Sequence, residues 1–116
     1  MDPARKPETG VDTFAALDLR IGRILEVEEF PEARKPAWRL TVDFGSTVGT
    51  LRTSAQVTNY PPESLVDRRV VGAINLGTKR IAGFSSEFLV LGAVQPDGSV
   101  RLLEVADDVV PGAAVA

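Results

Sequence analysis

The sequence predicts an all-β domain. Short apolar runs recur along the chain, with glycine, proline and polar residues between them, and this spacing is typical of strands. The first run is long and has a glycine inside it, and a short helical segment lies between the third and fourth runs. These observations favour a small Greek-key β-barrel of the OB type over a sandwich.

Composition restricts the chemistry of the chain. Its 116 residues, of which 44% are hydrophobic and 25% charged, suit a single globular domain. Because the chain has no cysteine and no histidine, it lacks thiolate nucleophiles, imidazole acid–base groups and the usual zinc ligands. We therefore expect a protein that is not an enzyme and needs no metal or cofactor.

Hydropathy and charge indicate the compartment and the kind of partner. No apolar run approaches the roughly 20 residues that span a bilayer, and the N-terminus lacks the apolar region of a signal peptide. The sequence thus predicts a cytoplasmic protein without membrane insertion. A net charge of −3 argues against coating of nucleic acid through bulk positive charge, although a local basic face is compatible with it.

The N-terminal part divides into a tail and a helical turn. Residues 1–11 are rich in proline and charge, which predicts a flexible tail and leaves residues 12–116 as the folded domain. Asp12 or Thr13 could cap one helical turn, in which Phe14 and Leu17 would plug one end of the barrel.

Three strands are expected next. Residues 18–30 show a period of two, and Gly22 within them suggests a bulge or a bend. The inward positions would be Leu19, Ile21, Leu25 and Val27. The second strand has the cleanest alternation of the chain, formed by Trp38, Leu40, Val42 and Phe44. A turn at residues 45–46 leads to a third strand over residues 48–57.

The second half contains one helix and the remaining strands. Residues 61–66 predict a short helix, because proline is well tolerated at the first helical position. Two buried strands follow, over residues 70–76 and up to residue 91, with a basic turn at residues 77–80 between them. A turn at residues 96–98 precedes a last strand over residues 100–105.

Polar groups on the third strand and cations on the basic turn are candidates for ligand binding. Small hydroxyl and amide side chains gather at residues 53–58, and such groups read base edges and backbone in RNA. A polar edge strand that prevents aggregation explains them equally well. Lys79 and Arg80 are likewise either RNA contacts or part of a solvated turn.

The loop after the first strand is a candidate site for polypeptides. Aromatic and proline residues lie in and beside it, and any that remain exposed would form an apolar pocket for an extended chain. The alternation around Trp38 favours a place in the barrel core for that side chain. The candidates for peptide binding are Phe30, Pro36 and Trp38.

Three ordered blocks of sequence resemble one known family. The runs ARKPAWRLTVDFG (33–45), TSAQVTNY (53–60) and KRIAGFSSEFLVLG (79–92) are similar to those of the CsaA family, the tRNA-binding and export-related chaperones of bacteria. These are relatives of the tRNA-binding domain appended to methionyl-tRNA synthetases. The resemblance implies that residues 12–116 form a tRNA-binding OB-fold domain that assembles as a homodimer.

The resemblance also implies particular ligands and contacts. It suggests a tRNA-binding protein that acts as a molecular chaperone for exported or unfolded polypeptides. The alternative is a peptide-binding secretion chaperone with no significant RNA binding. The RNA-facing positions carried over from the family are Ser54, Gln56, Asn75, Lys79, Arg80, Ser86 and Leu89. The apolar C-terminal residues 109–115 would bury themselves against a partner subunit or against the chain's own barrel.

Overall fold

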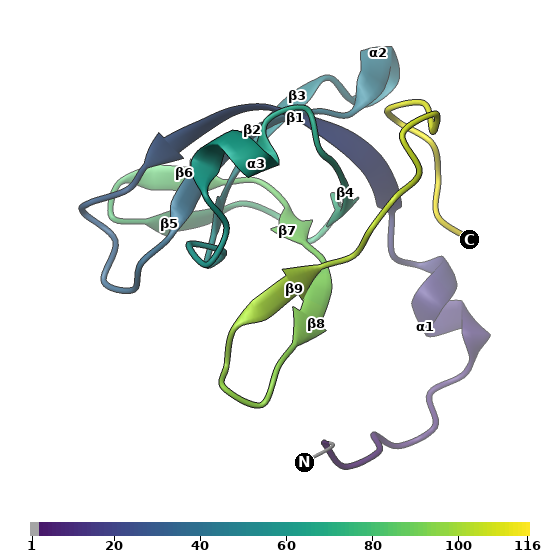
Figure 1. The fold of residues 1–116 in the computed structure, drawn as a ribbon. Coiled ribbons are helices and arrows are strands. Elements are labelled where there is room, and N and C mark those ends of the chain that lie inside the picture. The colour runs from purple at the N-terminus through teal and green to yellow at the C-terminus, as the bar shows by residue number, and fades with distance from the viewer. Residues whose placement is uncertain (1–2) are drawn as a thin grey trace.

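Five antiparallel strands form a nearly closed barrel, in the order β3-β2-β1-β4-β7 (Figure 1). The computed structural model describes residues 3–116. The barrel strands in it are β1 (Leu19–Glu29), β2 (Trp38–Asp43), β3 (Thr50–Ala55), β4 (Arg69–Ala73) and β7 (Leu89–Val90). Because β4 returns to pair with β1 rather than with β3, the topology is a Greek key, and the predicted OB-type all-β fold is confirmed.

Two hairpins and three short helices complete the described residues. One hairpin consists of β5 (Lys79–Ile81) and β6 (Phe84–Ser86), and the other of β8 (Gly92–Val94) and β9 (Val100–Leu102). The helices are α1 (Val11–Ala15), α2 (Gly45–Val48) and α3 (Pro62–Leu65). The predicted helix between the third and fourth barrel strands is confirmed as α3. The expected turn at residues 45–46 is instead the helical turn α2.

The N-terminal segment differs from the prediction in its cap. α1 begins at Val11 with Gly10 as its N-cap, so that neither Asp12 nor Thr13 caps it. Residues 3–10 form no regular element and are exposed. The predicted tail also includes residues 1–2, which lie outside the described residues, and its flexibility stays a prediction. No helix within residues 3–116 is long and apolar enough to cross a membrane.

β1 bends at Leu25. The register against β2 shifts between Ile24 and Glu26, which leaves Leu25 as the extra residue of a bulge. The bulge is therefore not at Gly22, as expected from the sequence. The shift also changes which side chains face inward: Ile24 is fully buried in the barrel, whereas the predicted inward residue Leu25 is only partly buried.

Gly22 is explained by a close contact instead. A Cβ atom there would collide with the side chains of Val42 and Phe44. Phe44 also crosses Gly72 of β4, where a Cβ would come within 2.7 Å of the Phe44 ring. Both glycines therefore leave room for one fully buried aromatic ring in the centre of the barrel.

A second apolar cluster lies outside the barrel. Leu19 and Ile21 of β1 pack with Val71 and Ala73 of β4 under the C-terminal segment. That segment runs along β1 through one isolated antiparallel bridge between Arg20 and Ala114. Gly112 N donates to Ile21 O at 2.7 Å, and Val115 N donates to Leu19 O at 2.9 Å. Much of the apolar C-terminus thus packs on the chain's own barrel.

The barrel closes between β3 and β6–β7 through side chains. Thr53 is 2% exposed, and its hydroxyl donates to the carbonyl oxygen of Phe88 at 2.7 Å. Since that uses the single Thr53 proton, the Ser86 hydroxyl donates to Thr53 Oγ1 at 3.0 Å. Ser86 Oγ then accepts from the amide of Ser54 at 3.2 Å. We call Thr53, Ser54, Ser86 and Phe88 the seam.

The hydrogen bonds of the seam predict how substitutions of Thr53 change the stability of the fold. Thr53→Val keeps the shape of the side chain but leaves Phe88 O without its donor, which should lower the free energy of unfolding by about 1–3 kcal/mol. Thr53→Ser keeps the hydroxyl and should cost no more than about 1 kcal/mol, for one lost methyl group. Urea denaturation of the parent and both variants measures the difference. A Thr53→Val variant as stable as the parent would show that the seam contributes nothing to closure.

Candidate nucleic-acid interface

A pocket of about 240 Å³ opens beside the seam, where β3 and β7 separate. Three residues predicted to face RNA, Ser54, Gln56 and Leu89, meet in it. Leu89 is 58% exposed at the rim. The full lining consists of Ser54, Ala55, Gln56, Val57, Leu89, Val90, Val100 and Leu102. The pocket thus combines apolar walls with two polar side chains, which is typical of a ligand site.

β9 forms the wall that the sequence did not indicate. Its Val100 and Leu102 line the pocket from the β8–β9 hairpin, which extends beyond the barrel in Figure 1. Asn59 Nδ2 donates to Val100 O at 3.1 Å, and Leu102 N donates to the Tyr60 hydroxyl at 3.0 Å. Two side chains from one loop therefore fix the wall at two points.

The far end of the same hairpin is also ordered. The predicted turn at residues 96–98 is confirmed, with Gly98 at a φ of 87°. The hydroxyl and the amide of Ser99 both donate to Asp97, which holds the pKa of that carboxyl below its usual value.

Lys79 and Arg80 lie on a strand and not in the expected basic turn. They belong to β5, and the turn of the hairpin is formed by Ala82 and Gly83, whose φ values are 48° and 82°. Positive φ at both central residues is typical of a type I′ turn, which suits the twist of a two-stranded hairpin. Both cations are exposed. Within residues 3–116 neither has a carboxylate partner.

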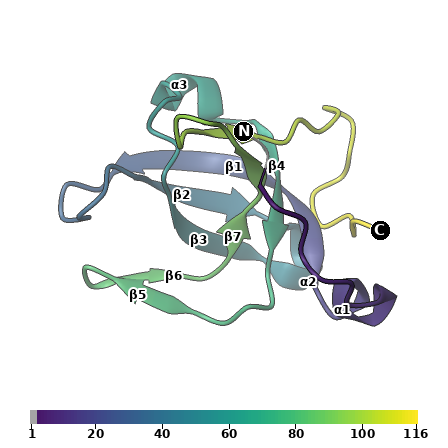
Figure 2. The same ribbon diagram turned by 90° about the horizontal axis from the view of Figure 1, so that it is seen from below.

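The hairpin adjoins the pocket through the seam. Lys79 is paired in register with Ser86, whose hydroxyl accepts from Ser54 at the pocket edge. Figure 2 shows the β5–β6 hairpin beside the barrel strands. Ser86 itself is 9% exposed, and its hydroxyl is engaged within the protein. We therefore expect Ser86 to position the hairpin, and direct contact with RNA stays a prediction.

Asn75 is exposed and connects other parts of the chain. Its Oδ1 accepts from Asp18 N at 2.8 Å, and its Nδ2 donates to Ala16 O at 2.9 Å. The side chain thus joins the segment after β4 to the link between α1 and β1. It does not line the pocket, and its role in RNA binding stays a prediction.

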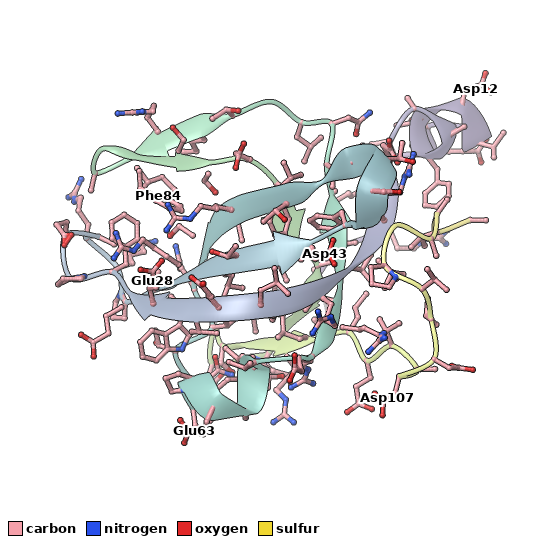
Figure 3. The ribbon with its side chains drawn as sticks, turned by 90° about the horizontal axis from the view of Figure 1, so that it is seen from above. Asp12, Glu28, Asp43, Glu63, Phe84 and Asp107 are labelled. Atoms are coloured by element: carbon pink, nitrogen blue, oxygen red, sulfur yellow. The ribbon has the colours of Figure 1, made fainter. Side chains whose placement is uncertain are left out.

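An aromatic cluster under the hairpin accounts for Phe30. This side chain is 5% exposed and packs edge-on against Phe84, with ring centroids 5.4 Å apart. Figure 3 shows Phe84 near Glu28, at the end of the molecule that carries this hairpin. The Arg52 guanidinium lies 4.8 Å from the Phe84 centroid and pairs with Glu28 at 2.8 Å. Arg39 covers both rings, at 5.3 Å and 5.9 Å.

The candidate peptide residues are thus in different environments. Phe30 lacks the exposure that a peptide pocket requires. Trp38 is partly buried, packs against the barrel core and donates its indole N–H to Tyr60 O at 3.1 Å. Pro36 is exposed in the loop. Peptide binding by these three residues stays a prediction.

Three of the acidic side chains that Figure 3 labels project away from the β5–β6 hairpin. Asp12, Glu63 and Asp107 project from other sides of the molecule in Figure 3. The carboxylates that form ion pairs engage Arg20, Arg23 and Arg52. Nearer the hairpin, the carboxylates of Glu28 and Glu87 are both bonded to Arg52. A chain of net charge −3 therefore carries on this hairpin two cations, Lys79 and Arg80, that do not pair with these carboxylates.

Comparison with protein families and curated relatives points to tRNA. The family described as a putative tRNA binding domain matches residues 19–114. The methionine–tRNA ligase of Porphyromonas gingivalis is 36% identical over 104 residues, which cover 90% of this chain and 15% of that enzyme. The Pyrococcus abyssi enzyme is 41% identical over 99 residues, which cover 78% and 13%. The chain thus spans a small part of these relatives, and the matched domain is not itself catalytic.

Two solved structures match over their whole length. The crystal structure of the chaperone CsaA from Bacillus anthracis has a TM-score of 0.88 and 43% identity, covering 95% of this chain and 100% of that one. The CsaA chaperone protein of Picrophilus torridus has a TM-score of 0.88 and 41% identity, covering 94% and 100%. The chain therefore belongs to the family of putative tRNA binding domains and, within it, to the CsaA group.

Proposed function

We propose that the chain binds tRNA at the surface formed by the pocket and the β5–β6 hairpin. The observation that carries this proposal is that two exposed cations, without a carboxylate partner among residues 3–116, lie on the hairpin that the seam joins to a pocket in which Ser54, Gln56 and Leu89 converge. The family match gives the ligand class. In this arrangement Lys79 and Arg80 contact phosphates, and the pocket residues contact the nucleosides.

The charge of the chain limits how this binding can work. With a net charge of −3, the whole molecule repels RNA weakly, and attraction comes from the few cations on one face. Each phosphate contact contributes about 0.7–0.9 to the slope of log affinity against log salt. We therefore expect a shallow salt dependence, which depends strongly on each cation of the hairpin.

Charge reversal on the hairpin tests the proposal. Lys79→Glu combined with Arg80→Glu should weaken tRNA binding and lower the salt slope by about 1.4–1.8, because two phosphate contacts are lost. Filter binding of bulk tRNA at several salt concentrations measures both quantities.

The matched control is Arg5→Glu combined with Lys6→Glu. It makes the same charge change in the exposed N-terminal segment, which Figure 1 places away from the hairpin. This control should keep most of the affinity and the slope. Equal losses in the two double variants would mean that only net charge matters, and an unchanged slope in the hairpin variant would refute the assignment.

A second function is suggested by the two neighbours whose names describe them as chaperones. We propose that the chain also binds unfolded or exported polypeptides, as a cytoplasmic protein. Leu89, 58% exposed, offers apolar surface at the pocket, and Leu76, 54% exposed, offers more in the segment between β4 and β5. Pro36 is exposed in the loop between β1 and β2, and it would extend this apolar surface in a complex in which that loop moves toward the pocket.

Tryptophan fluorescence tests the second function, because Trp38 is the one tryptophan of the chain. Its indole is bonded to Tyr60, which in turn holds the β9 wall. A peptide that enters the pocket should therefore change Trp38 emission, and excess tRNA should reverse the change. Peptide binding that tRNA does not reverse would place the two ligands on separate surfaces. No binding of unfolded polypeptide would remove the chaperone function.

We further propose that the chain forms a homodimer through α1 and the tip of the C-terminal segment. Val11 and Phe14 of α1 are 77% and 46% exposed, and Val110 of the C-terminal segment is 71% exposed beside residues 45–47. Figures 1 and 2 both place α1 near the C-terminal end of the chain. Exposed apolar side chains such as these are stabilised by burial against a second copy.

Sedimentation equilibrium at micromolar concentration tests the assembly. The parent chain should sediment as a dimer, and Phe14→Asp combined with Val110→Asp should shift it to monomer, because charge is placed in an apolar interface. A parent chain that sediments as a monomer contradicts the dimer. A variant that stays dimeric moves the interface to another face.

A further inference from the structure

We infer that the pocket between β3, β7 and β9 receives one unpaired nucleobase of RNA, turned out of its stack. This inference rests on the proposed tRNA binding and goes further by naming the part of the RNA that is recognised. A base held in a pocket requires single-stranded or locally opened RNA, whereas binding by cations alone would accept a duplex surface.

The size of the pocket suits a small planar group. Its volume of about 240 Å³ lies below the range of about 300–1,000 Å³ that is usual for drug-sized ligands. One ring or two fused rings fit such a space, and a folded polypeptide element does not. Its position next to the separation of β3 and β7 makes it accessible from the surface that carries the hairpin.

The chemistry of the lining matches a base in both of its parts. The walls are apolar and include Ala55, Val57 and Leu102, which suit the faces of an aromatic ring. Ser54 and Gln56 supply a hydroxyl and an amide that can donate and accept. Neither of these two side-chain groups has a hydrogen-bond partner within the part of the chain that the structure describes. They are therefore free to bond to the polar edge of a base.

The pocket is formed before any ligand binds. Asn59 and Tyr60 hold the backbone on either side of Arg101, as described above, and the Arg68 guanidinium lies 4.9 Å from the Tyr60 ring centroid. On the opposite side, the seam holds Ser54 against Ser86. A base thus enters a site whose walls are already ordered, which lowers the entropic cost of binding.

The neighbouring cations distinguish RNA from other occupants. Lys79 is paired with Ser86 and lies on the face of the hairpin that is joined to the pocket edge at Ser54, where it can hold a phosphate that flanks a turned-out base. Arg80 lies on the opposite face, where its guanidinium donates to the Ser85 hydroxyl at 3.0 Å. An apolar peptide would explain the walls of the pocket but not the two unpaired cations. A duplex would explain the cations but not the pocket. An unpaired nucleotide uses both.

The test compares the affinity of the chain for RNA that carries its bases with its affinity for the RNA backbone alone. The probes are a short single-stranded RNA, a strand of the same length with abasic sites in place of its bases, and the fully paired duplex. The parent chain should bind the intact strand about 10- to 100-fold more tightly than the abasic strand, because the faces of one base are buried against apolar side chains. The duplex should bind no more tightly than the abasic strand.

Filling the pocket should remove this preference. Ala55→Phe places a ring in the space, so that the intact and abasic strands should bind equally, with the salt slope of the parent because no phosphate contact is lost. Val94→Phe is the matched control, since Val94 lies on β8 of the hairpin whose β9 strand lines the pocket, is 74% exposed and does not line the pocket itself. Should Ala55→Phe fail to fold, Leu89→Ala at the exposed rim serves in its place, with the same preference expected to fall.

Two outcomes overturn the inference. A parent chain that binds intact and abasic strands equally has no base site. If the pocket variants stop binding an apolar peptide but still prefer the intact strand over the abasic strand, the pocket is a polypeptide site. These results differ from a failure of the proposed function, in which charge reversal of Lys79 and Arg80 leaves tRNA binding unchanged whatever the pocket does.

Discussion

The closure of the barrel depends on one buried hydroxyl. Thr53 donates to Phe88 O and accepts from Ser86, so a side chain replaces the backbone ladder that β3 and β7 do not form. Beside it, Glu87 N donates to Arg52 O at 2.8 Å, and Arg52 N donates to a Glu87 carboxylate oxygen at 3.0 Å. A closed ladder would leave no opening between the strands. A seam of side chains closes the core and still lets the strands diverge at the pocket.

The same seam orders the surface around the pocket. It holds β6 against β3, and β6 carries β5 with its two cations. The aromatic cluster below the hairpin adds rigidity, because Phe84 packs on Phe30 and lies against Arg39 and Arg52. Sites built on rigid elements hold their groups in place without a ligand. The proposed interface is therefore a consequence of how this barrel closes. The second apolar cluster, formed by Leu19, Ile21, Val71 and Ala73 under the C-terminal segment, takes no part in it.

Periodicity was sufficient to predict the strands of the fold class, because alternation such as that of Leu40, Val42 and Phe44 reflects burial directly. The helix before β4 was predicted from the prolines at its start. Periodicity failed at Ile24, since a bulge changes the inward face without a signal in the composition. It also placed Lys79 in a turn, because a two-stranded hairpin between barrel strands depends on tertiary contacts of Phe84. Resemblance indicated Ser54, Gln56 and Leu89, which do line one pocket. Val100 and Leu102 were missed because their role depends on where Tyr60 holds β9.

An NMR titration of the isotope-labelled chain with tRNA tests most directly whether the seam and its pocket form the binding surface. Amide signals should shift for residues 54–57, 79–80 and 89–90 and for β9, while those of Leu19 and Val71 in the second apolar cluster and of residues 109–115 stay in place. Shifts confined to the second apolar cluster or to the C-terminal segment, with the seam unaffected, would contradict this assignment.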